Sequence, residues 1–512
     1  MSHATLRIDG DRLWARLEAL GEVGAVHGAA GERGCARLAL TDADREGRDL
    51  VLSWMHDLGL SVVVDAVGNV VGTRAGTNPQ AAAVMVGSHI DTVRTGGRFD
   101  GNLGVLGGLE VIETLEQHGV ATVHPISVAY FTNEEGARFQ PDMLGSLVYV
   151  GGMAVEAALD VRAADDGARL GDELARIGYA GPTPCPTATA PHAYFELHIE
   201  QGPVLEDQGF TIGAVTGVQG ISWTEVTVTG QSAHAGTTPM RLRHDPGFVA
   251  AAITTGVRAI ATAMAGTQVA TVGRCEFHPN LVNVVPATVT LTVDLRNTDE
   301  GLLQQAEEVF AALCEQLAGE EGVTIARRTL ARFQPVEFDE SMIGLVESTA
   351  RALGHTTMRM PSGAGHDAQM LARVCPTGMI FVPSVDGLSH NIAEYTTPAD
   401  VVAGADVLLQ VVLAAAGAHS AAVHWCPRAS TSSPSTRHSP TRWQRSGARR
   451  CSCTKPSVRM SIGGWCSAMP TRFAASASNA ARIGREALTS TSPAPRSSSP
   501  AKWPACSHWV RR

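Results

Sequence analysis

The sequence predicts an α/β fold of two domains, in which a smaller domain is inserted into a larger one. Three observations lead to this prediction. An apolar run at 81–86 leads into a Gly-rich polar loop and then a helical pattern at 103–115, as in a sheet with crossover helices. At about residue 213 the pattern changes to strands and helices in the order β-α-β-β-α-β. After about residue 331 single helices and strands alternate again, so the chain returns to the first domain.

The elements of residues 1–212 have local signals at most boundaries. Thr41 with Asp44 three residues later resembles a capping box, which opens an amphipathic helix. A Gly68-Asn69 turn joins two strands into a hairpin. Helices are predicted at 10–21, 41–58 and 103–115, and strands at 61–66, 70–74, 81–86, 126–132 and 193–199. The elements of 141–192 are poorly defined.

The segment 213–330 is predicted to be the inserted domain, and its element order is that of a ferredoxin-like unit. Residues 221–229 alternate apolar and polar side chains, as a half-exposed antiparallel strand does. The other predicted elements are strands at 268–277, 288–296 and 323–330 and helices at 246–264 and 299–317. Residues 331–418 then complete the first domain with helices at 340–353 and 399–417 and a strand at 377–382.

The charge of the chain is unevenly distributed. The whole chain has 40 Lys+Arg and 50 Asp+Glu, and residues 421–512 hold 15 of the basic residues but one acidic residue, so residues 1–420 carry a formal charge of −24. A body this acidic does not attract nucleic acid or an anionic membrane by bulk electrostatics. We therefore expect neither of these as a partner.

The cysteines and apolar stretches indicate the compartment. Five cysteines are scattered through residues 1–420 without a C-x-x-C pair, which is typical of reduced thiols in a cytoplasmic protein. The first ten residues contain no apolar signal core. The most apolar long stretch, 401–418, carries Asp406 and Gln410, so we predict a packed helix there rather than a membrane span.

The tail, residues 419–512, differs from the rest in composition. It is rich in Ser, Arg, Pro and Ala, and it holds five of the ten Cys and five of the eight Trp. A basic disordered arm could bind nucleic acid, although Trp and Cys are unusual in such arms. We favour the alternative that the tail is out-of-frame translation after a lost stop codon, and we exclude it from the site.

Five polar motifs fall at or just beyond predicted strand ends, where ligand sites form in open α/β sheets. They are His89-Ile-Asp91, Phe99-Asp100-Gly101, Asn133-Glu134-Glu135-Gly136, Glu196-Leu-His198-Ile-Glu200-Gln201-Gly202 and Leu388-Ser-His390-Asn391. Each side chain alone also fits a solvated loop, a turn or a helix cap. The combination is more specific than its parts, because all five recur at the same kind of position.

These residues have the chemistry of a metal site. Two metal ions close together need a bridging carboxylate and one or two terminal ligands each, with positions left open for water. The set that could supply this is His89, Asp100, Glu135, His198 and His390. Asp91 could hold the other ring nitrogen of His89, and Glu134 could act as general base on an activated water. We therefore predict two divalent metal ions per subunit, zinc or manganese, cobalt or nickel, because this ligand set suits several ions.

Six longer motifs extend this pattern. They are Gly87-Ser-His-Ile-Asp-Thr-Val, Gly96-Gly-Arg-Phe-Asp-Gly, Asn133-Glu-Glu-Gly-Ala-Arg-Phe, His198-Ile-Glu-Gln-Gly-Pro-Val-Leu-Glu, Gly230-Gln-Ser-Ala-His-Ala-Gly-Thr-Thr-Pro-Met and Pro361-Ser-Gly-Ala-Gly-His-Asp-Ala. These motifs resemble the hydantoinase/carbamoylase family of dinuclear-metal amidases. That family includes N-carbamoyl-L-amino-acid hydrolases, allantoate amidohydrolases and β-ureidopropionases, within the superfamily of metal-dependent carboxypeptidases and aminoacylases. The resemblance covers about residues 5–418, and the tail is its one departure.

The resemblance implies a division of labour between the domains. Residues 1–212 and 331–418 would form the metal-binding catalytic domain, and 213–330 a lid and dimerisation domain. His89 and His390 would lie on different metals, Asp100 would bridge them, Glu135 and His198 would complete the pair, and Glu134 would be the base, with Asp91 beside His89.

The resemblance also implies substrate contacts. His234 would come from the neighbouring subunit and polarise the scissile carbonyl, which implies a homodimer through the inserted domain. Gln201, Asn283, Arg296 and Gly365 match substrate-binding positions. An Arg at position 296 could pair bidentately with the α-carboxylate of a substrate.

The implied activity is hydrolysis of a C–N bond other than a peptide bond. The first substrate class is an N-carbamoyl-L-amino acid, which would give the L-amino acid, CO2 and NH3. Allantoate amidohydrolase and β-ureidopropionase activities share every motif and stay open. A third hypothesis is a non-catalytic protein with a nucleic-acid-associated basic tail, and the presence of Glu134 and every expected ligand weighs against it.

Overall fold

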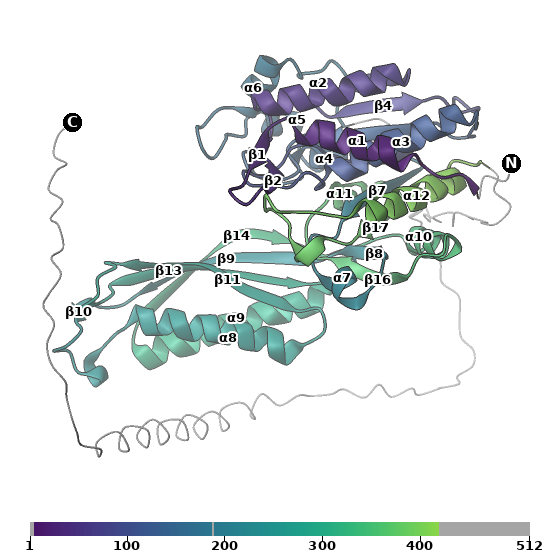
Figure 1. Cartoon of the computed structure of the whole chain (residues 1–512). Coiled ribbons are helices and arrows are strands. Elements are labelled where there is room, and N and C mark those ends of the chain that lie inside the picture. Colours follow the sequence, from purple (N-terminus) through teal and green to yellow (C-terminus); the bar gives the residue numbers. More distant parts are fainter. Residues whose placement is uncertain (1–4, 187–188, 419–512) are drawn as a thin grey trace, which may run out of the picture. The chain divides into compact units, whose positions relative to one another are not determined.

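The computed structural model describes residues 5–186 and 189–418 of the chain (Figure 1). The tail at 419–512, with both interpretations given for it above, lies outside the described residues. The described part has two separate hydrophobic cores, one of which is formed by residues before 219 and after 337, and the other by residues between 225 and 318.

A nine-stranded mixed sheet lies in the larger core. Its strands are β3 (Ser61–Val64), β4 (Val70–Arg74), β5 (Val84–His89), β6 (Ile126–Phe131), β7 (Ala193–Ile199), β8 (Ile212–Val218), β15 (Val336–Glu337), β16 (Thr357–Ser362) and β17 (Thr377–Val382). Their order is β15-β8-β17-β7-β5-β6-β4-β3, and β16 pairs with β8. The four central neighbours β17, β7, β5 and β6 are parallel, so their carboxyl ends meet at one edge of the sheet.

Helices cover both faces of this sheet. The helices of this part of the chain are α1 (Gly10–Gly21), α2 (Asp42–Asp57), α3 (Asn102–Gln117), α4 (Leu144–Tyr149), α5 (Val155–Leu159), α6 (Leu170–Ile177), α7 (Val204–Gln208), α10 (Glu340–Ala352), α11 (Asp367–Leu371) and α12 (Pro398–Ala415). Leu197 of β7 packs against Gly107 of α3 and Gly404 of α12, whereas its neighbour Glu196 accepts a hydrogen bond from Ala368 in α11. Since adjacent strand residues point to opposite faces, α3 and α12 lie on one face and α11 on the other.

Two local predictions in this region are confirmed. The hydroxyl of Thr41 accepts a hydrogen bond from the backbone N–H of Asp44 at 3.3 Å, which caps α2 as predicted. Strands β3 and β4 pair antiparallel as a hairpin. A shorter pair, β1 (Ala25–His27) and β2 (Arg33–Cys35), had no prediction.

Three strands of the large sheet differ from the sequence prediction. Strand β5 continues to His89 rather than ending at residue 86. Strand β8 lies in the large sheet although it extends past residue 212, and its Gly213, Ala214 and Gly217 gave no apolar run or alternation to recognise. Strand β16 was also not predicted.

A second sheet of four antiparallel strands forms the smaller core. Its strands are β9 (Gly220–Thr229), β11 (Val269–His278), β13 (Thr288–Asn297) and β14 (Thr324–Phe333), in the order β11-β13-β9-β14. Helices α8 (Pro246–Met264) and α9 (Glu300–Glu321) pack together on one face of it (Figure 1). The sequence of these elements along the chain is the predicted β-α-β-β-α-β. Strands β10 (Ala233–His234) and β12 (Val284–Val285) form a separate short antiparallel pair. Strand β10 comes shortly after the end of β9 at Thr229.

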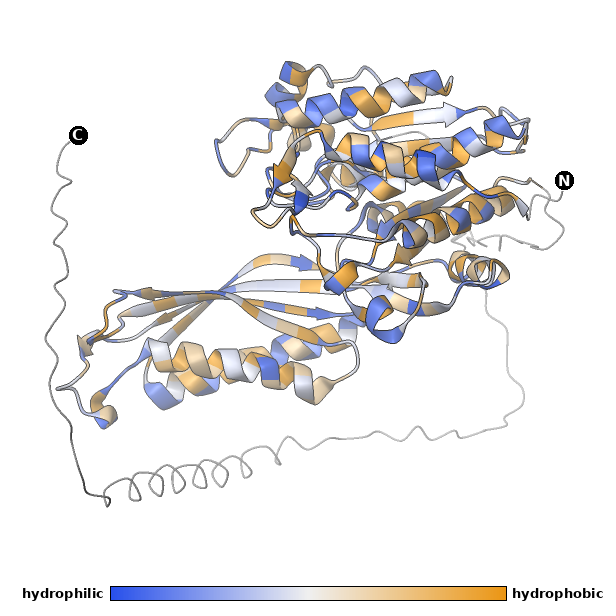
Figure 2. Ribbon diagram, in the orientation of Figure 1, coloured by the Kyte–Doolittle hydropathy of each residue, from blue (hydrophilic) through white to orange (hydrophobic). Residues whose placement is uncertain are grey.

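Helices α8 and α12 are long and apolar enough to cross a membrane by length and composition alone. Helix α12 is apolar along most of its length in Figure 2. Of its 18 residues, 67% are buried, and the helix packs against α3, α10, β7 and β17. This is the packed helix that the sequence predicts at 401–418. Helix α8 packs on β11, β13 and α9 with one face.

Candidate metal and active site

The predicted ligands lie together at the edge where the parallel strands end. His89 is the last residue of β5, and His198 is the penultimate residue of β7. Glu134 and Glu135 follow β6, and His390 follows β17 after a short 3-10 turn (Val385–Gly387). The topology therefore brings side chains from four strand ends to one place, as expected for an open α/β sheet.

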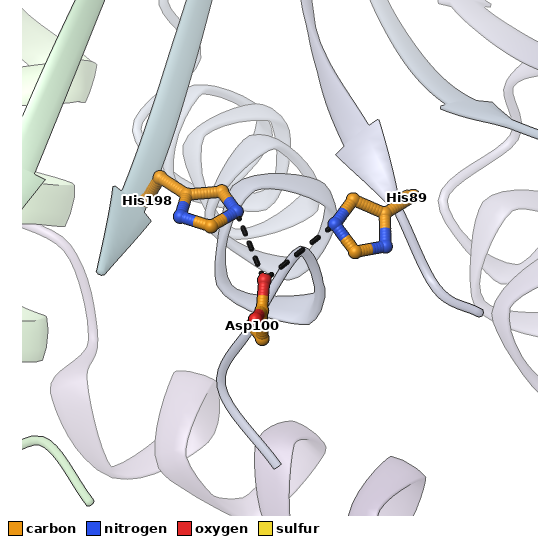
Figure 3. A group of neighbouring side chains, drawn as sticks. All are labelled: His89, Asp100 and His198. Carbon is orange, nitrogen blue, oxygen red and sulfur yellow. Dashed lines mark ion pairs between the residues drawn. The ribbon is translucent and has the colours of Figure 1, made fainter. Parts of the chain in front are cut away.

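Asp100 lies between two groups of these side chains. Its Oδ1 is 3.6 Å from Nε2 of His89 and 3.2 Å from Nε2 of His198 (Figure 3). Its Oδ2 is 3.6 Å from Nε2 of His390, and Oε2 of Glu135 is 3.2 Å from the same nitrogen. The ligand atoms within each group lie no more than 4.8 Å apart. One carboxylate thus faces both groups.

These donors fit divalent metal ions. Imidazole and carboxylate are the ligands that zinc and its neighbours accept. Oε1 of Glu135 is buried and has no hydrogen-bond partner among the described residues, which leaves it available to a cation. His89, Asp100 and His198 are buried, whereas the side chain of His390 is 53% exposed. The group that contains His390 is therefore the more open of the two.

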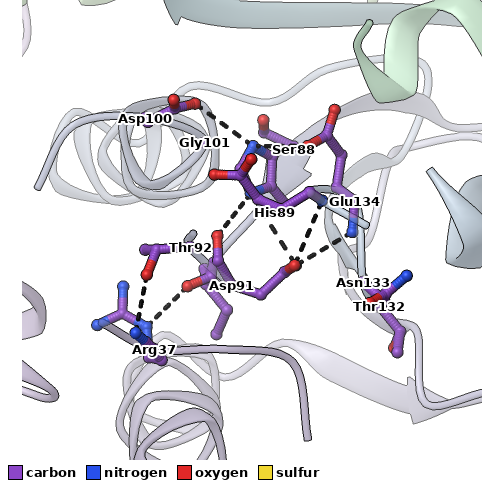
Figure 4. A network of polar contacts seen from close by, with 12 residues as sticks. Arg37, Ser88, His89, Asp91, Thr92, Asp100, Gly101, Thr132, Asn133 and Glu134 are labelled. Atoms are coloured by element: carbon purple, nitrogen blue, oxygen red, sulfur yellow. Dashed lines mark hydrogen bonds and ion pairs between the residues drawn. The ribbon is translucent and has the colours of Figure 1, made fainter. Parts of the chain in front are cut away.

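A network of hydrogen bonds around Asp91 holds this site (Figure 4). Nδ1 of His89 lies 2.9 Å from the main-chain oxygen of Asp91 and 4.0 Å from its Oδ1. Asp91 therefore lies beside the second ring nitrogen of His89, and its main-chain oxygen is the closer of the two atoms. The carboxylate accepts hydrogen bonds from the backbone N–H groups of Glu134 and Glu135, at 3.2 and 3.4 Å. Asp91 therefore holds the turn that carries both glutamates.

The carboxyl groups differ in their affinity for protons. Burial raises the pKa of Glu134 well above its usual value, and Oε2 of this residue lies 3.3 Å from Nε2 of His89. Burial would also raise the pKa of Asp100, but hydrogen bonds from His198 and His89 hold it well below its usual range. Glu134 is thus suited to carry a proton, and Asp100 to remain charged.

Three non-glycine residues at this edge have left-handed backbone conformations. The φ angles are 58° at Asn133, 59° at Gln201 and 52° at His390. Such a conformation costs about 1–2 kcal/mol per residue. The side-chain amide of Asn133 offsets the cost by donating to the carbonyl of Phe139 at 2.8 Å. The strain is concentrated in the loops that present the candidate site.

A cavity of about 180 Å³ opens over the two groups. Its walls come from both sheets: His89, Asp100, Glu134, Glu135, Asp142, His198, Gln201, Ile221, Trp223, Arg296, Ala364, Gly365, His366 and His390. Of the substrate residues predicted, Gln201, Arg296 and Gly365 are in this wall. Gln201 also donates a hydrogen bond from Nε2 to Oδ2 of Asp100 at 2.8 Å.

Arg296 is held by three groups. Its Nη2 lies 2.9 Å from Oδ2 of Asp294, its Nη1 donates to the carbonyl of Gly363 at 2.6 Å, and its guanidinium lies 5.9 Å from the ring centre of Trp223. Arg296 belongs to β13 of the smaller sheet and Gly363 follows β16 of the larger sheet. The contact therefore joins the two sheets beside the cavity.

His234 and Asn283 lie elsewhere in the described part of the chain. Both are exposed: His234 ends β10 and Asn283 directly precedes β12, and neither lines the cavity above. They are neighbours, because the carbonyl of Asn283 accepts a hydrogen bond from the N–H of Ala235 at 3.0 Å. Nδ1 of His234 accepts hydrogen bonds from the N–H groups of Gly236 and Thr237, at 3.1 and 3.2 Å.

The structure adds site residues that the sequence analysis did not single out. Asp142, Trp223 and His366 line the cavity, and Nε2 of His366 lies 2.8 Å from Oγ of Ser362. His366 lies in the motif at 361–368, so the sequence contained a feature that could have pointed to it. Asp142 and Trp223 had none, because only packing between distant segments brings them to the cavity.

The open α/β sheet and the clustered histidines and carboxylates at its carboxyl edge define a metal-dependent hydrolase. The model of Peptidase family M20/M25/M40 matches residues 85–414, and the chain belongs to this family. The prediction that the chain is a hydrolase is thereby confirmed.

Known proteins similar to this chain confirm the resemblance to hydantoinase/carbamoylase amidases. An N-carbamoyl-L-amino-acid amidohydrolase of Rhizobium meliloti is 45% identical over 80% of this chain and 96% of that protein. One of Geobacillus stearothermophilus is 43% identical over 79% of this chain and 98% of its own length. A crystal structure of a hydantoinase/carbamoylase family amidase from Burkholderia multivorans is 46% identical, with a TM-score of 0.77, and covers 80% of this chain and 99% of its own.

Proposed function

We propose that this protein is an N-carbamoyl-L-amino-acid amidohydrolase, which cleaves a C–N bond other than a peptide bond and releases the L-amino acid, CO2 and NH3. One observation carries the proposal. Asp100 faces two groups of candidate ligands beneath a cavity that also contains Arg296. The names of the relatives from Rhizobium meliloti and Geobacillus stearothermophilus support the substrate class.

Two divalent metal ions per subunit complete the site in this proposal. His89, Asp100 and His198 would hold one, and Asp100, Glu135 and His390 would hold the other. When bound, such ions supply Lewis acidity and lower the pKa of water to about 7. Zinc is the first candidate, and manganese, cobalt or nickel would also suit these donors.

Glu134 moves the proton in this reaction. Its buried carboxylate takes a proton from the attacking water and delivers it to the leaving nitrogen, so the carbonyl carbon gains an oxygen as its C–N bond breaks. Asp91 supports the step because its carboxylate accepts hydrogen bonds from the N–H groups of Glu134 and Glu135. The carbamate that is released decomposes to CO2 and ammonia.

Arg296 binds the α-carboxylate of the substrate. Asp294 and the carbonyl of Gly363 fix the guanidinium beside the cavity, so less freedom is lost when the carboxylate pairs with it. Gln201 and Gly365, which line the same cavity, complete the contacts to the substrate.

The segment 213–330 acts in this proposal as an inserted, ferredoxin-like lid and dimerisation domain of a homodimer. His234 and Asn283 then reach the cavity of the partner subunit together. Exposed apolar residues near them support an interface, namely Met240, Leu242, Phe277, Leu281 and Val282. Because two N–H groups donate to Nδ1 of His234, Nε2 is the nitrogen left to carry the hydrogen and donate to a carbonyl oxygen.

The remaining proposals concern the binding partners and the cellular compartment. The formal charge of −24 on residues 1–420 supports a small-molecule substrate and no nucleic-acid or membrane partner. The five cysteines of the described part are free thiols, which supports a cytoplasmic protein.

Ammonia release from a panel of substrates tests the function. The panel contains N-carbamoyl-L-amino acids, N-carbamoyl-β-alanine and allantoate, with the enzyme in zinc or manganese. Turnover of the N-carbamoyl-L-amino acids is expected. Preference for N-carbamoyl-β-alanine or allantoate would reassign the protein to one of the alternative activities, and no turnover of any would refute the amidohydrolase proposal.

A further inference from the structure

Glu394 is a buried carboxylate with no role in the proposals above. It lies four residues after His390 and is 2% exposed. Its Oε1 accepts hydrogen bonds from the backbone N–H groups of Phe99 and Asp100, each at 3.2 Å. Glu394 thus reaches from the loop of one candidate ligand to the backbone of another.

A second contact joins the same two loops. Oγ of Ser389 lies 3.3 Å from Oε2 of Glu394 and 3.1 Å from Oδ2 of Asp100. Ser389 directly precedes His390, so the oxygen of Asp100 that faces His390 is tied to the loop of His390 through this hydroxyl. Both oxygens of Glu394 therefore make contacts that link Asp100 to the loop of His390.

Gly97 makes room for this arrangement. A Cβ atom at position 97 would overlap the carboxyl group of Glu394. Burying a carboxyl group costs free energy unless hydrogen bonds compensate it. The loop that contains Asp100 therefore provides both the space and the two N–H donors that Glu394 needs.

We infer that Glu394 is a positioning residue, which holds Asp100 and His390 at the distance that the second metal ion requires. The inference rests on the proposed function, because it assumes the group of Asp100, Glu135 and His390 binds that ion. The group of His89, Asp100 and His198 depends less on Glu394, because it shares only Asp100 with the other group and its two histidines belong to strands β5 and β7. Loss of Glu394 therefore weakens the site of His390 more than the site of His89 and His198, whereas a general loss of stability would weaken both equally.

The test is the number and affinity of zinc ions bound by the full chain, measured by equilibrium with zinc-buffered solutions, together with the thermal unfolding curve. The wild-type chain is expected to bind two zinc ions. Glu394→Ala is expected to bind the second about 10- to 100-fold more weakly, the usual effect of losing a residue that orients a ligand. Glu394→Gln keeps an oxygen for the two N–H donors and is expected to bind both ions nearly as the wild type does.

Two further variants complete the design. Glu200 is also buried, and its two oxygens accept hydrogen bonds from the backbone N–H groups of Val204 and Leu205, each at 2.8 Å. Glu200→Ala is therefore a matched control, which should keep both zinc ions. Gly97→Ala displaces the carboxyl group of Glu394 and should reproduce the loss of the second ion even if Glu394→Ala does not fold.

The outcomes separate this inference from the proposed function. Two zinc ions with unchanged affinities in Glu394→Ala or Gly97→Ala would overturn the positioning role and leave the dinuclear site intact. Equal weakening of both ions would also overturn it. A wild-type chain that binds a single zinc ion would refute the dinuclear site and the inference together.

Discussion

Nε2 of His390 lies 3.6 Å from Oδ2 of Asp100, although the two residues follow different strands far apart in the sequence. The other oxygen of Asp100 faces His198 at 3.2 Å. This two-sided carboxylate is the observation that supports the proposed pair of metal ions over a single ion.

Glu134→Gln should leave metal binding intact and remove the proton carrier. Because general acid–base catalysis contributes about 10²- to 10⁴-fold, kcat should fall by that factor with an unchanged zinc content. Steady-state ammonia release and metal analysis of the same sample check this. A variant with normal kcat would show that another group takes the proton.

Arg296→Ala should raise KM for N-carbamoyl-L-amino acids by about 10- to 100-fold, because a charged hydrogen bond contributes about 1.5–3 kcal/mol. Asp294→Asn, which keeps one acceptor oxygen beside the guanidinium, should raise KM less. Steady-state kinetics distinguish the two variants. An unchanged KM in Arg296→Ala would place the carboxylate of the substrate elsewhere.

His234→Ala should lower kcat by about 10²- to 10³-fold if Nε2 donates to the carbonyl oxygen. Mixing it with Glu134→Gln should restore up to about a quarter of the wild-type activity, because half of randomly mixed dimers are hybrids with one intact site of two. Activity after verified subunit exchange measures this. No recovery would mean that His234 does not act across the dimer.

His192 should make stability depend on pH. Burial, and then the neighbouring imidazole of His124, lower the pKa of His192. The rings are stacked with centroids 4.0 Å apart. The folded state therefore binds fewer protons than the unfolded state below the usual His pKa of about 6.5, and stability should fall as the pH falls through that value.

The variant His192→Phe tests this dependence. Thermal unfolding at several pH values between about 5 and 8 should show a smaller loss of stability on acidification than in the wild type, because the residue that gains a proton on unfolding is absent. Identical pH profiles for the two proteins would contradict the prediction.

The clustering of the candidate ligands could be predicted from the sequence because its signals are local. His89, His198 and Glu134 follow or end apolar strands, and the parallel pairing of those strands brings their ends together. The capping of α2 by Thr41 is equally local. These features depend on neighbours in the chain.

Other parts of the site depend on long-range packing and had no local signal. Trp223 reaches the cavity from β9 of the smaller sheet, and Asp142 reaches it from the loop between β6 and α4. Strand β8 lies within the large sheet. Because Gly213 and Gly217 interrupt its apolar residues, its sequence shows neither an apolar run nor an alternation. The sequence pointed to Asp91 as the neighbour of His89, but residue types do not reveal that the main-chain oxygen is the atom closer to the ring nitrogen.

The measurement that tests the central claim most directly is ammonia release from N-carbamoyl-L-amino acids by the full chain before and after removal of metal ions. Activity should disappear with a chelator and return on addition of zinc, manganese, cobalt or nickel, with full activity at two ions per subunit. Full activity in a preparation verified to be free of metal would contradict the account.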